Sequence, residues 1–182
     1  MYLIHNTDIT SLKSILKDEC LKSLSLQKKT NKKAQTNLGG DMYTENNFVY
    51  FACTNKLFDN KVMVGITLYF NSKLLFDKSF YIANLWSTVP QRLVTDSNKT
   101  NKKKYNKNYT KYNSVLTKLY NYSISQLKNG EAFQVFQQIA VRNKVNLDEL
   151  VAIQFYNKSF ATESIIKYIT KFYPTITIKI NN

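Results

Sequence analysis

The chain has few of the residues that mark special folds. Its 182 residues include two cysteines, two prolines and four glycines. Two cysteines are too few for a disulfide framework, and so little proline and glycine excludes collagen-like and linker-like chains. One histidine and two cysteines without finger-like spacing predict that no metal is bound. The glycines form neither a GxGxxG motif nor a Walker loop.

Long apolar runs are absent too. The longest, Val62 to Phe70, has nine residues, about half of what a membrane span needs. The start, MYLIHNTD, lacks the cationic and apolar regions of a signal peptide. Cys20 and Cys53 are expected to be reduced thiols. These features predict a protein of the cytoplasm or nucleus, in a reducing compartment, neither secreted nor in contact with a membrane.

What the chain does contain is apolar residues and positive charge. Hydrophobic residues make up 43% and aromatic residues 14%, enough for the core of one domain over residues 1–182. The net charge is +14, and all but two of the 26 cationic residues are lysine. Such a charge favours polyanionic partners such as nucleic acid. Lysine and asparagine have AT-rich codons, so an AT-rich genome explains the same bias equally well.

Apolar patterning predicts a mixed α+β fold. Residues 27–47 read as a loop, 147–150 as a turn, and 96–112 as an exposed basic insertion in the single domain. Residues 132–141 fit a strand or a helix. Helices are expected at 9–17, 114–127 and 161–172, and strands at 2–4 (ending at His5), 48–52, 62–70, 80–82, 151–155 and 175–180, with Leu74–Leu75 just beyond the third of these strands.

Three segments, taken in their order along the chain, are the most informative about the fold. They are LIHNTDITSLKSILKDECL at 3–21, FVYFACTNK at 48–56, and NGEAFQVFQQIAVRNKVNLDELVAIQF at 129–155. In this order they resemble the ADP-ribosyltransferase fold of poly(ADP-ribose) polymerases, and KVMVGITLYFNSKLL at 61–75 resembles the long central strand of that family. The resemblance touches most of the chain. It implies an α+β split β-sandwich with flanking helices.

The same resemblance implies a site that takes NAD as substrate, without a metal, in a cleft between two small sheets. His5 matches the histidine that bonds a ribose, and Tyr50 the tyrosine that stacks on nicotinamide. Glu131 matches the glutamate that stabilises the cationic ribose as the glycosidic bond breaks. Asn6 follows the histidine, at the position whose backbone holds the nicotinamide amide, and Thr7 completes the motif. The implied catalytic residues are therefore His5, Tyr50 and Glu131, and the implied NAD-binding residues are His5, Asn6, Thr7 and Tyr50.

This chain departs from the family pattern at several positions. Asn6 replaces a glycine, although asparagine tolerates unusual backbone angles better than most residues. Phe48–Val49 precede Tyr50 where a glycine is common, and the Ser–Lys–Ser after Tyr–Phe–Ala is missing. Glu131 follows a glycine rather than an asparagine. Without the resemblance, these three residue types are equally typical of structural roles. They are a lone histidine, one of 13 tyrosines, and an acid at the start of a helix.

The basic insertion has a composition of its own. Lysines neutralise phosphates and tyrosines stack on bases, which is how single strands are bound, whereas most charge runs are simply solvated. If the fold is right, the insertion approaches the acceptor. Its candidate acceptor-contacting residues are Lys99, Lys102, Lys103, Lys104, Tyr105, Lys107, Tyr109 and Lys111, next to Tyr112.

The sequence thus predicts an NAD-dependent ADP-ribosyltransferase acting on a protein or nucleic-acid acceptor. The alternative is a non-catalytic basic protein that binds nucleic acid or a host partner, as a large DNA virus could encode. A metal-independent nuclease is disfavoured, because one histidine and scattered acids form no recognisable acid–base pair.

Overall fold

The chain forms two compact units in a computed structural model that describes residues 2–30, 47–54, 56–58, 65–78, 80–84, 92–93 and 137–181. Unit 1 comprises Met1–Leu21, Thr54–Ser72 and Asn146–Asn182, and unit 2 comprises Lys22–Cys53 and Lys73–Val145. Both units are therefore assembled from segments far apart in the sequence. The single domain over 1–182 stays a prediction.

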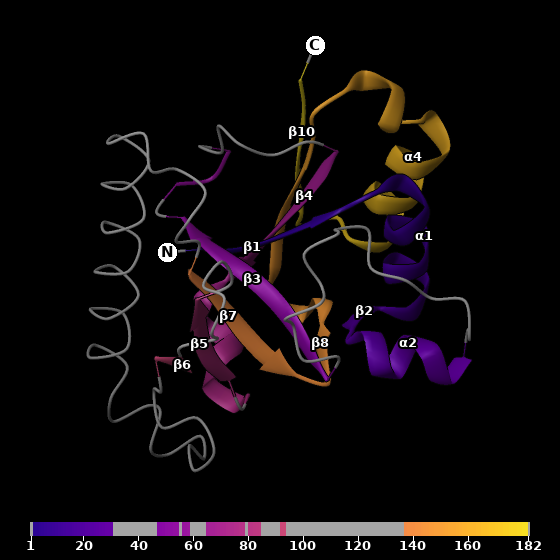
Figure 1. Cartoon of the computed structure of the whole chain (residues 1–182). Coiled ribbons are helices and arrows are strands. Elements are labelled where there is room, and N and C mark those ends of the chain that lie inside the picture. The colour runs from indigo at the N-terminus through magenta and orange to yellow at the C-terminus, as the bar shows by residue number, and fades with distance from the viewer. Residues whose placement is uncertain are drawn as a thin grey trace. The chain divides into compact units, whose positions relative to one another are not determined.

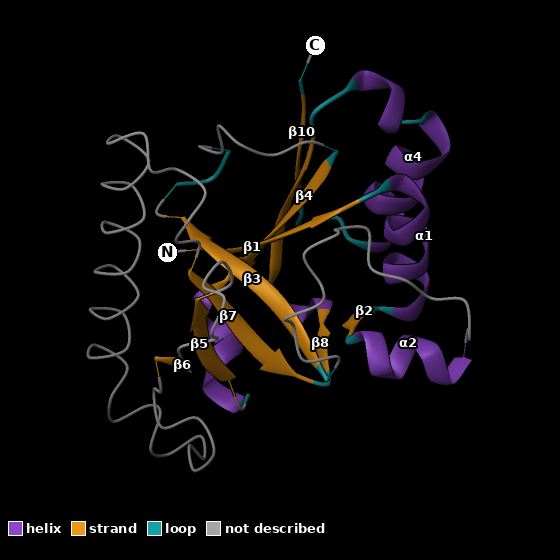
Figure 2. Cartoon of the chain, viewed as in Figure 1, coloured by secondary structure: helices purple, strands orange, loops and turns teal. Residues whose placement is uncertain are grey.

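Unit 1 is built on four neighbouring strands of a mixed sheet. Its strands are β1 (Tyr2–Thr7), β4 (Ile66–Asn71), β9 (Leu150–Phe155) and β10 (Thr177–Ile180), in the order β10-β9-β4-β1. β4 runs antiparallel to both β1 and β9, whereas β10 is parallel to β9 (Figure 2). All five residues Ile66–Phe70 are buried, as are Ala152–Phe155. This double-sided burial explains why both strands are nearly continuous apolar runs.

Two helices, α1 (Ile9–Asp18) and α4 (Glu163–Phe172), lie side by side along this sheet (Figure 1). Each buries one stripe, Leu12 and Leu16 in α1 and Ile165 and Ile169 in α4. The four-residue spacing within each pair is that of one helix face. The apolar stripe therefore docks each helix on the core of unit 1.

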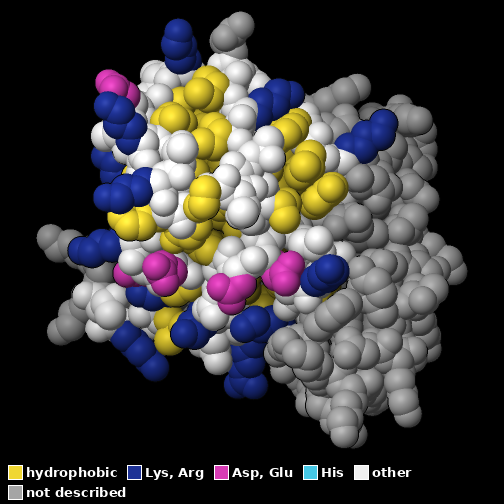
Figure 3. All heavy atoms as spheres, turned by 180° about the vertical axis from the view of Figure 1, so that it is seen from behind, with side chains coloured by type: hydrophobic (Ala, Val, Ile, Leu, Met, Phe, Trp, Pro, Cys, Tyr) yellow, Lys and Arg dark blue, Asp and Glu magenta, His cyan; other side chains and the backbone are white. Residues whose placement is uncertain are grey.

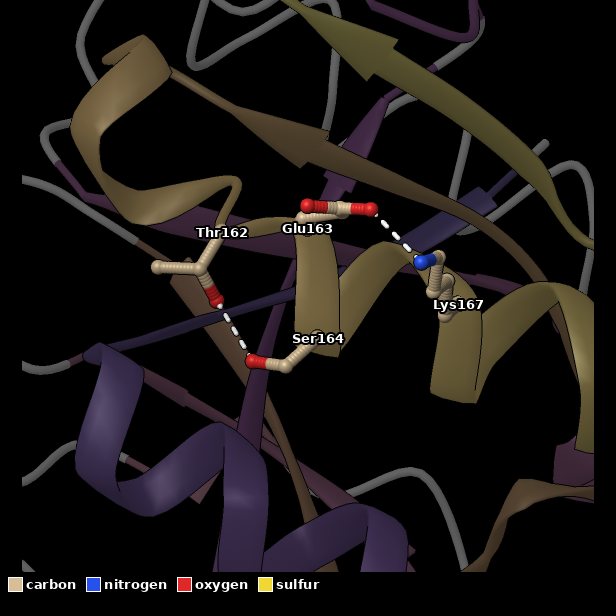
Figure 4. A network of polar contacts seen from close by, with 4 residues as sticks. All are labelled: Thr162, Glu163, Ser164 and Lys167. Atoms are coloured by element: carbon tan, nitrogen blue, oxygen red, sulfur yellow. Dashed lines mark hydrogen bonds and ion pairs between the residues drawn. The ribbon is translucent and has the colours of Figure 1, made fainter.

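Polar side chains stabilise the starts of α1 and α4 in different ways. Asp8 caps α1: its Oδ1 accepts from the Ser11 backbone N–H at 2.8 Å and its Oδ2 from the Ser11 hydroxyl at 2.9 Å. At the start of α4 the exposed Glu163 and Lys167 form an ion pair of 2.6 Å, one turn apart (Figure 4). An exposed pair of this kind stabilises by only about 0.3–0.5 kcal/mol.

Unit 2 holds most of four further strands. β3 (Phe48–Thr54), β5 (Phe80–Asn84), β6 (Arg92–Leu93) and β7 (Gln137–Arg142) are all antiparallel, in the order β3-β7-β5-β6. α2 (Leu24–Thr30) and the 3-10 helix η2 (Ser72–Asp77) accompany them. β2 (Cys20–Lys22) and β8 (Lys144–Asn146) make a separate two-stranded sheet. Short 3-10 turns occupy Leu147–Glu149 and Lys158–Phe160.

Most expected elements are present among the described residues, with three corrections. β1 does not end at His5 but continues to Thr7, because residues 5–7 pair in register with β4. The first residues of the expected loop at 27–47 belong to helix α2 (24–30), and the closing strand expected at 175–180 begins at Thr177. Leu74–Leu75, just beyond β4, lie in η2. The described part of the ambiguous segment 132–141 is strand β7. Residues 31–46, the insertion at 96–112 and the helix expected at 114–127 lie outside the described residues.

Candidate active site

Three consecutive residues on β1 carry the predicted NAD-binding motif. His5 pairs with Leu68 of β4, Asn6 with Thr67 and Thr7 with Ile66. Side chains alternate along a strand, so Asn6 points to one face of the sheet and its two neighbours to the other. His5 and Thr7 are half-buried, whereas Asn6 is exposed. The three residues therefore lie next to one another at the end of β1 in unit 1, directly before the capped start of α1.

A glycine allows the backbone before β4 to pass close to Thr7, the last residue of this motif. Gly65, just before β4, has φ +95°, and a Cβ placed there would lie 3.0 Å from the backbone oxygen of Thr7. Its carbonyl oxygen accepts from the Tyr156 backbone N–H at 3.0 Å. Gly65 thus meets the Thr7 backbone on one side and the end of β9 on the other. No other residue combines that φ with that approach without strain.

Asn6 is tied to the sheet by its side chain. The buried hydroxyl of Thr67 donates to Asn6 Oδ1 at 2.9 Å. The hydroxyl of Tyr156 hydrogen-bonds with Thr67 and Tyr69. Tyr69 in turn donates to Gln154 Oε1 at 2.7 Å, and Gln154 Nε2 donates to Asn181 Oδ1 at 3.3 Å. A polar network therefore runs from Asn6 to the end of β10.

Burial governs the electrostatics of this network. It raises the pKa of the Tyr156 hydroxyl above the ordinary 10.0, and the hydrogen bonds with Thr67 and Tyr69 act in the opposite direction. Tyr156 is therefore a neutral hydroxyl near pH 7. As such it can both donate and accept within the network.

Thr67, Tyr69, Gln154 and Tyr156 were not among the residues singled out from the sequence. The only signal was their spacing: each pair stands two residues apart within an apolar strand or at its end, so that its members share one face. Within a single strand this pattern is indistinguishable from an ordinary half-polar face. Only the pairing of β4 with β9 shows that the four polar groups meet.

Tyr50 belongs to the other unit. It lies on β3 opposite Ala140 of β7 and is half-buried. Its flanks Val49 and Phe51 are buried, as expected for neighbours that point to the opposite face. The apolar run FVYFA thus forms the predicted strand and leaves the Tyr50 ring partly accessible.

Glu131 and the basic insertion with Lys99, Lys102, Lys103, Lys104, Tyr105, Lys107, Tyr109 and Lys111 lie outside the described residues. Their roles remain predictions from sequence. On the face that Figure 3 shows, the lysine and arginine side chains of the described residues are spread out, with acidic side chains between them. That face carries mixed charge rather than a single basic patch.

Within the described ranges, no three His, Cys, Asp or Glu side chains gather as they would around a metal ion. Cys20 is a buried free thiol. None of the described helices has the length and apolar character needed to span a membrane.

The fold can be compared with solved structures. The chain matches DarT from Thermus sp. 2.9 over 99% of its length, in a complex with NAD+ (TM-score 0.56, 11% identity, 94% of that chain) and in a complex with ADP-ribosylated single-stranded DNA (TM-score 0.56, 11% identity, 93% of that chain). It also matches DarTG from Thermosipho africanus in complex with ADP-ribose (TM-score 0.61, 12% identity), covering 98% of this chain and 49% of that one. No family model and no curated protein matches. The predicted ADP-ribosyltransferase fold is confirmed.

Proposed function

We propose that the chain is an NAD-dependent ADP-ribosyltransferase whose acceptor is nucleic acid. The observation that carries the proposal is the shared fold: 99% of the chain superposes on a DarT that was captured both with NAD+ and with ADP-ribosylated single-stranded DNA. The His5–Asn6–Thr7 motif on β1 agrees with it. The net charge of +14 suits a polyanionic acceptor.

In the proposed reaction the bond between C1′ of the nicotinamide ribose and the ring nitrogen breaks. Nicotinamide leaves with the electron pair as a neutral molecule, and the ribose becomes an oxocarbenium-like cation. A nucleophilic atom of the acceptor then attacks C1′ and loses its proton to solvent. Electrostatic stabilisation of the developing cation is the main task left to the protein.

Each predicted site residue has a role in this scheme. His5 hydrogen-bonds a ribose hydroxyl, Tyr50 stacks on the nicotinamide ring, and the Glu131 carboxylate stabilises the cation. Asn6 and Thr7 complete the contacts to the nicotinamide end. These residue assignments rest on the sequence pattern, and strand β1, which carries His5, Asn6 and Thr7 together, supports three of them.

The proposal is tested by incubating the purified protein with NAD and a single-stranded DNA oligonucleotide. Release of nicotinamide and a mass gain of one ADP-ribose on the oligonucleotide are the expected results. Glu131→Gln should lower the turnover by about 10²-fold or more, since it removes the stabilising charge. Glu163→Gln is the matched control, because Glu163 is exposed at the start of α4 in an ion pair of little energetic weight.

The test separates the candidate functions. Turnover of Glu131→Gln within a few-fold of wild type contradicts the role of that carboxylate. If NAD is neither consumed nor able to raise the melting temperature, the proposed activity is wrong. Tight DNA binding without turnover then favours the non-catalytic alternative.

A further inference from the structure

Helix α4 carries two aromatic side chains at the surface. Among the described residues three large apolar side chains are exposed, and two of them, Tyr168 (38%) and Phe172 (55%), stand one turn apart on α4. Their rings are in contact, with 4.6 Å between the centroids and 41° between the ring planes. Tyr168 and Phe172 therefore form one aromatic pair.

The core of unit 1 does not account for this pair. The buried stripe of α4 consists of Ile165 and Ile169, and Phe172 continues that stripe three residues further on. Phe172 is nevertheless more than half exposed, so the stripe extends beyond the core that covers it. Exposed aromatic side chains that lie next to one another are typical of a surface that contacts a partner.

A cation lies over the aromatic pair. The ammonium nitrogen of Lys171 is 5.2 Å from the centroid of the Phe172 ring. Lys167, one turn earlier, is paired with Glu163, whereas within the described ranges no carboxylate pairs with Lys171. An apolar peptide would satisfy the rings but not this ammonium. A nucleotide satisfies both, because it offers a flat base next to a phosphate.

The aromatic pair has a defined distance from the predicted NAD-binding motif. The hydroxyl of Tyr173, next to Phe172, donates to the Leu16 carbonyl oxygen at 3.0 Å, so the end of α4 lies beside the last turns of α1. α1 begins two residues after His5–Asn6–Thr7 and has 10 residues, about 15 Å at 1.5 Å per residue. Phosphates of a stacked strand are about 3.4 Å apart, so this distance corresponds to about four nucleotides.

We propose that Tyr168, Lys171 and Phe172 form a second contact for the single-stranded acceptor, away from the reacting nucleotide. A base stacks on the aromatic pair, and the Lys171 ammonium moves from the Phe172 ring to the adjacent phosphate. The exchange is favourable, because an exposed cation–π contact is worth about 2- to 5-fold in affinity and a stacked base about 5- to 150-fold. The inference rests on the proposed function, which makes nucleic acid the acceptor.

The length of the strand separates this contact from the active site. The full chain is given NAD and mixed-sequence oligonucleotides of three or of twelve nucleotides, and ADP-ribose transfer is measured. Tyr168→Ala/Phe172→Ala should raise KM for the longer strand by about 5- to 150-fold with kcat unchanged. Transfer to the shorter strand should stay as in wild type, because that strand cannot reach both places.

Binding without NAD gives a second readout. Fluorescence anisotropy with the labelled twelve-nucleotide strand should show the same loss of affinity for Tyr168→Ala/Phe172→Ala. Ile180→Ala is the matched control, because Ile180 is similarly exposed (41%) but has no ring, and it should bind like wild type. Equal losses in the control and the double variant would show that stacking is not involved.

Further variants test the two parts of the contact. Tyr168→Phe and Phe172→Tyr keep both rings and should bind like wild type. Lys171→Gln should flatten the slope of log affinity against log salt by about 0.7, whereas the loss in the alanine variant should persist at high salt. Thermal melting followed by circular dichroism checks the fold. If the double variant does not fold, Tyr168→Ala alone takes its place, with a loss in the same direction.

The outcomes distinguish this inference from the proposed function. A wild type that neither binds nor modifies either strand overturns both. Binding of the long strand that depends on the aromatic pair, without transfer, overturns only the proposed function. Transfer to both strands that the alanine variant leaves unchanged, or weakens equally, overturns only the second contact. A dimer in light scattering that this variant converts to monomers also overturns it, because the pair is then a contact between two copies of the chain.

Discussion

The hydroxyl of Tyr69 donates a 2.7 Å hydrogen bond to Oε1 of Gln154, which lies 85 positions further along the chain. Tyr69 is 0% and Gln154 2% exposed, so the bond is made out of reach of water. The Tyr69 ring also meets Phe58 edge to face, with 5.4 Å between the ring centroids. The bond therefore satisfies the polar groups of two adjacent strands, β4 and β9, in the middle of unit 1.

Removing this hydroxyl should destabilise the protein. Tyr69→Phe keeps the ring but leaves the buried Gln154 oxygen without its donor, at an expected cost of about 1–3 kcal/mol in the free energy of unfolding. Urea unfolding followed by circular dichroism measures it. Tyr168→Phe is the control, because Tyr168 lies on the exposed side of α4 and should change the stability by less than about 0.5 kcal/mol. Equal unfolding midpoints for the two variants would show that the Tyr69 bond contributes nothing.

Gly65 is a second position where a small substitution, the addition of a Cβ atom, should destabilise the protein. Gly65→Ala must accept φ +95° and a Cβ 3.0 Å from the Thr7 backbone oxygen, so we expect a loss of about 1–3 kcal/mol. The same urea titration measures this loss. Asn143→Gly, at φ 66°, is the opposite case, since it relieves a left-handed non-glycine residue and should be close to neutral. A neutral Gly65→Ala would mean that β1 can move away from the turn before β4.

The apolar strands could be predicted from sequence because their signal is local. FVYFA and VAIQF contain enough aromatic and aliphatic residues within five positions to identify a buried strand, and both are strands in the structure. The confirmed α1 likewise follows from its apolar stripe and from Asp8 as its cap. Each of these features depends on neighbours in the sequence.

The elements that the sequence does not predict have no local apolar pattern. The sequence predicts a strand that ends at His5, yet Asn6 and Thr7 also pair with β4 some 60 residues away, where the Thr67 hydroxyl hydrogen-bonds the Asn6 side chain. α2 has no buried residue and hence no apolar stripe to detect. It is held at its start by backbone bonds from Leu26 and Gln27 to the Ser23 carbonyl oxygen. Such contacts leave no periodic signal in the sequence.

Tyr156 should make the stability depend on alkaline pH. Burial raises its pKa in the folded state above the 10.0 of the unfolded chain, so the folded state holds this proton more tightly. The corresponding stability is fully present below pH 10 and is lost as the pH rises through the folded-state pKa. Wild type should therefore lose more stability between pH 9 and pH 11 than Tyr156→Phe, which has no proton to lose.

The comparison of these two proteins cancels most other titrations. All other titratable groups are present in both proteins, including Tyr173, whose pKa is also raised by burial. The measurement is the urea unfolding free energy at the two pH values. If wild type and Tyr156→Phe lose the same amount, the Tyr156 hydroxyl is not protected in the folded state.

The basic insertion makes a prediction about salt. If its lysines contact the phosphates of a single-stranded acceptor, each neutralised phosphate adds about 0.7 to the slope of log affinity against log salt, or about 4 for six lysines. Replacing Lys99, Lys102, Lys103, Lys104, Lys107 and Lys111 with glutamine should flatten the slope by up to that amount. The matched control replaces the exposed lysines of the described surface at 13, 17, 144, 158, 167 and 171, which removes the same formal charge from outside the insertion. Fluorescence anisotropy with a labelled oligonucleotide from 50 to 300 mM salt gives both slopes. If both variants flatten the slope equally, the attraction comes from net charge alone. The prediction that the insertion contacts the phosphates of the acceptor is then wrong.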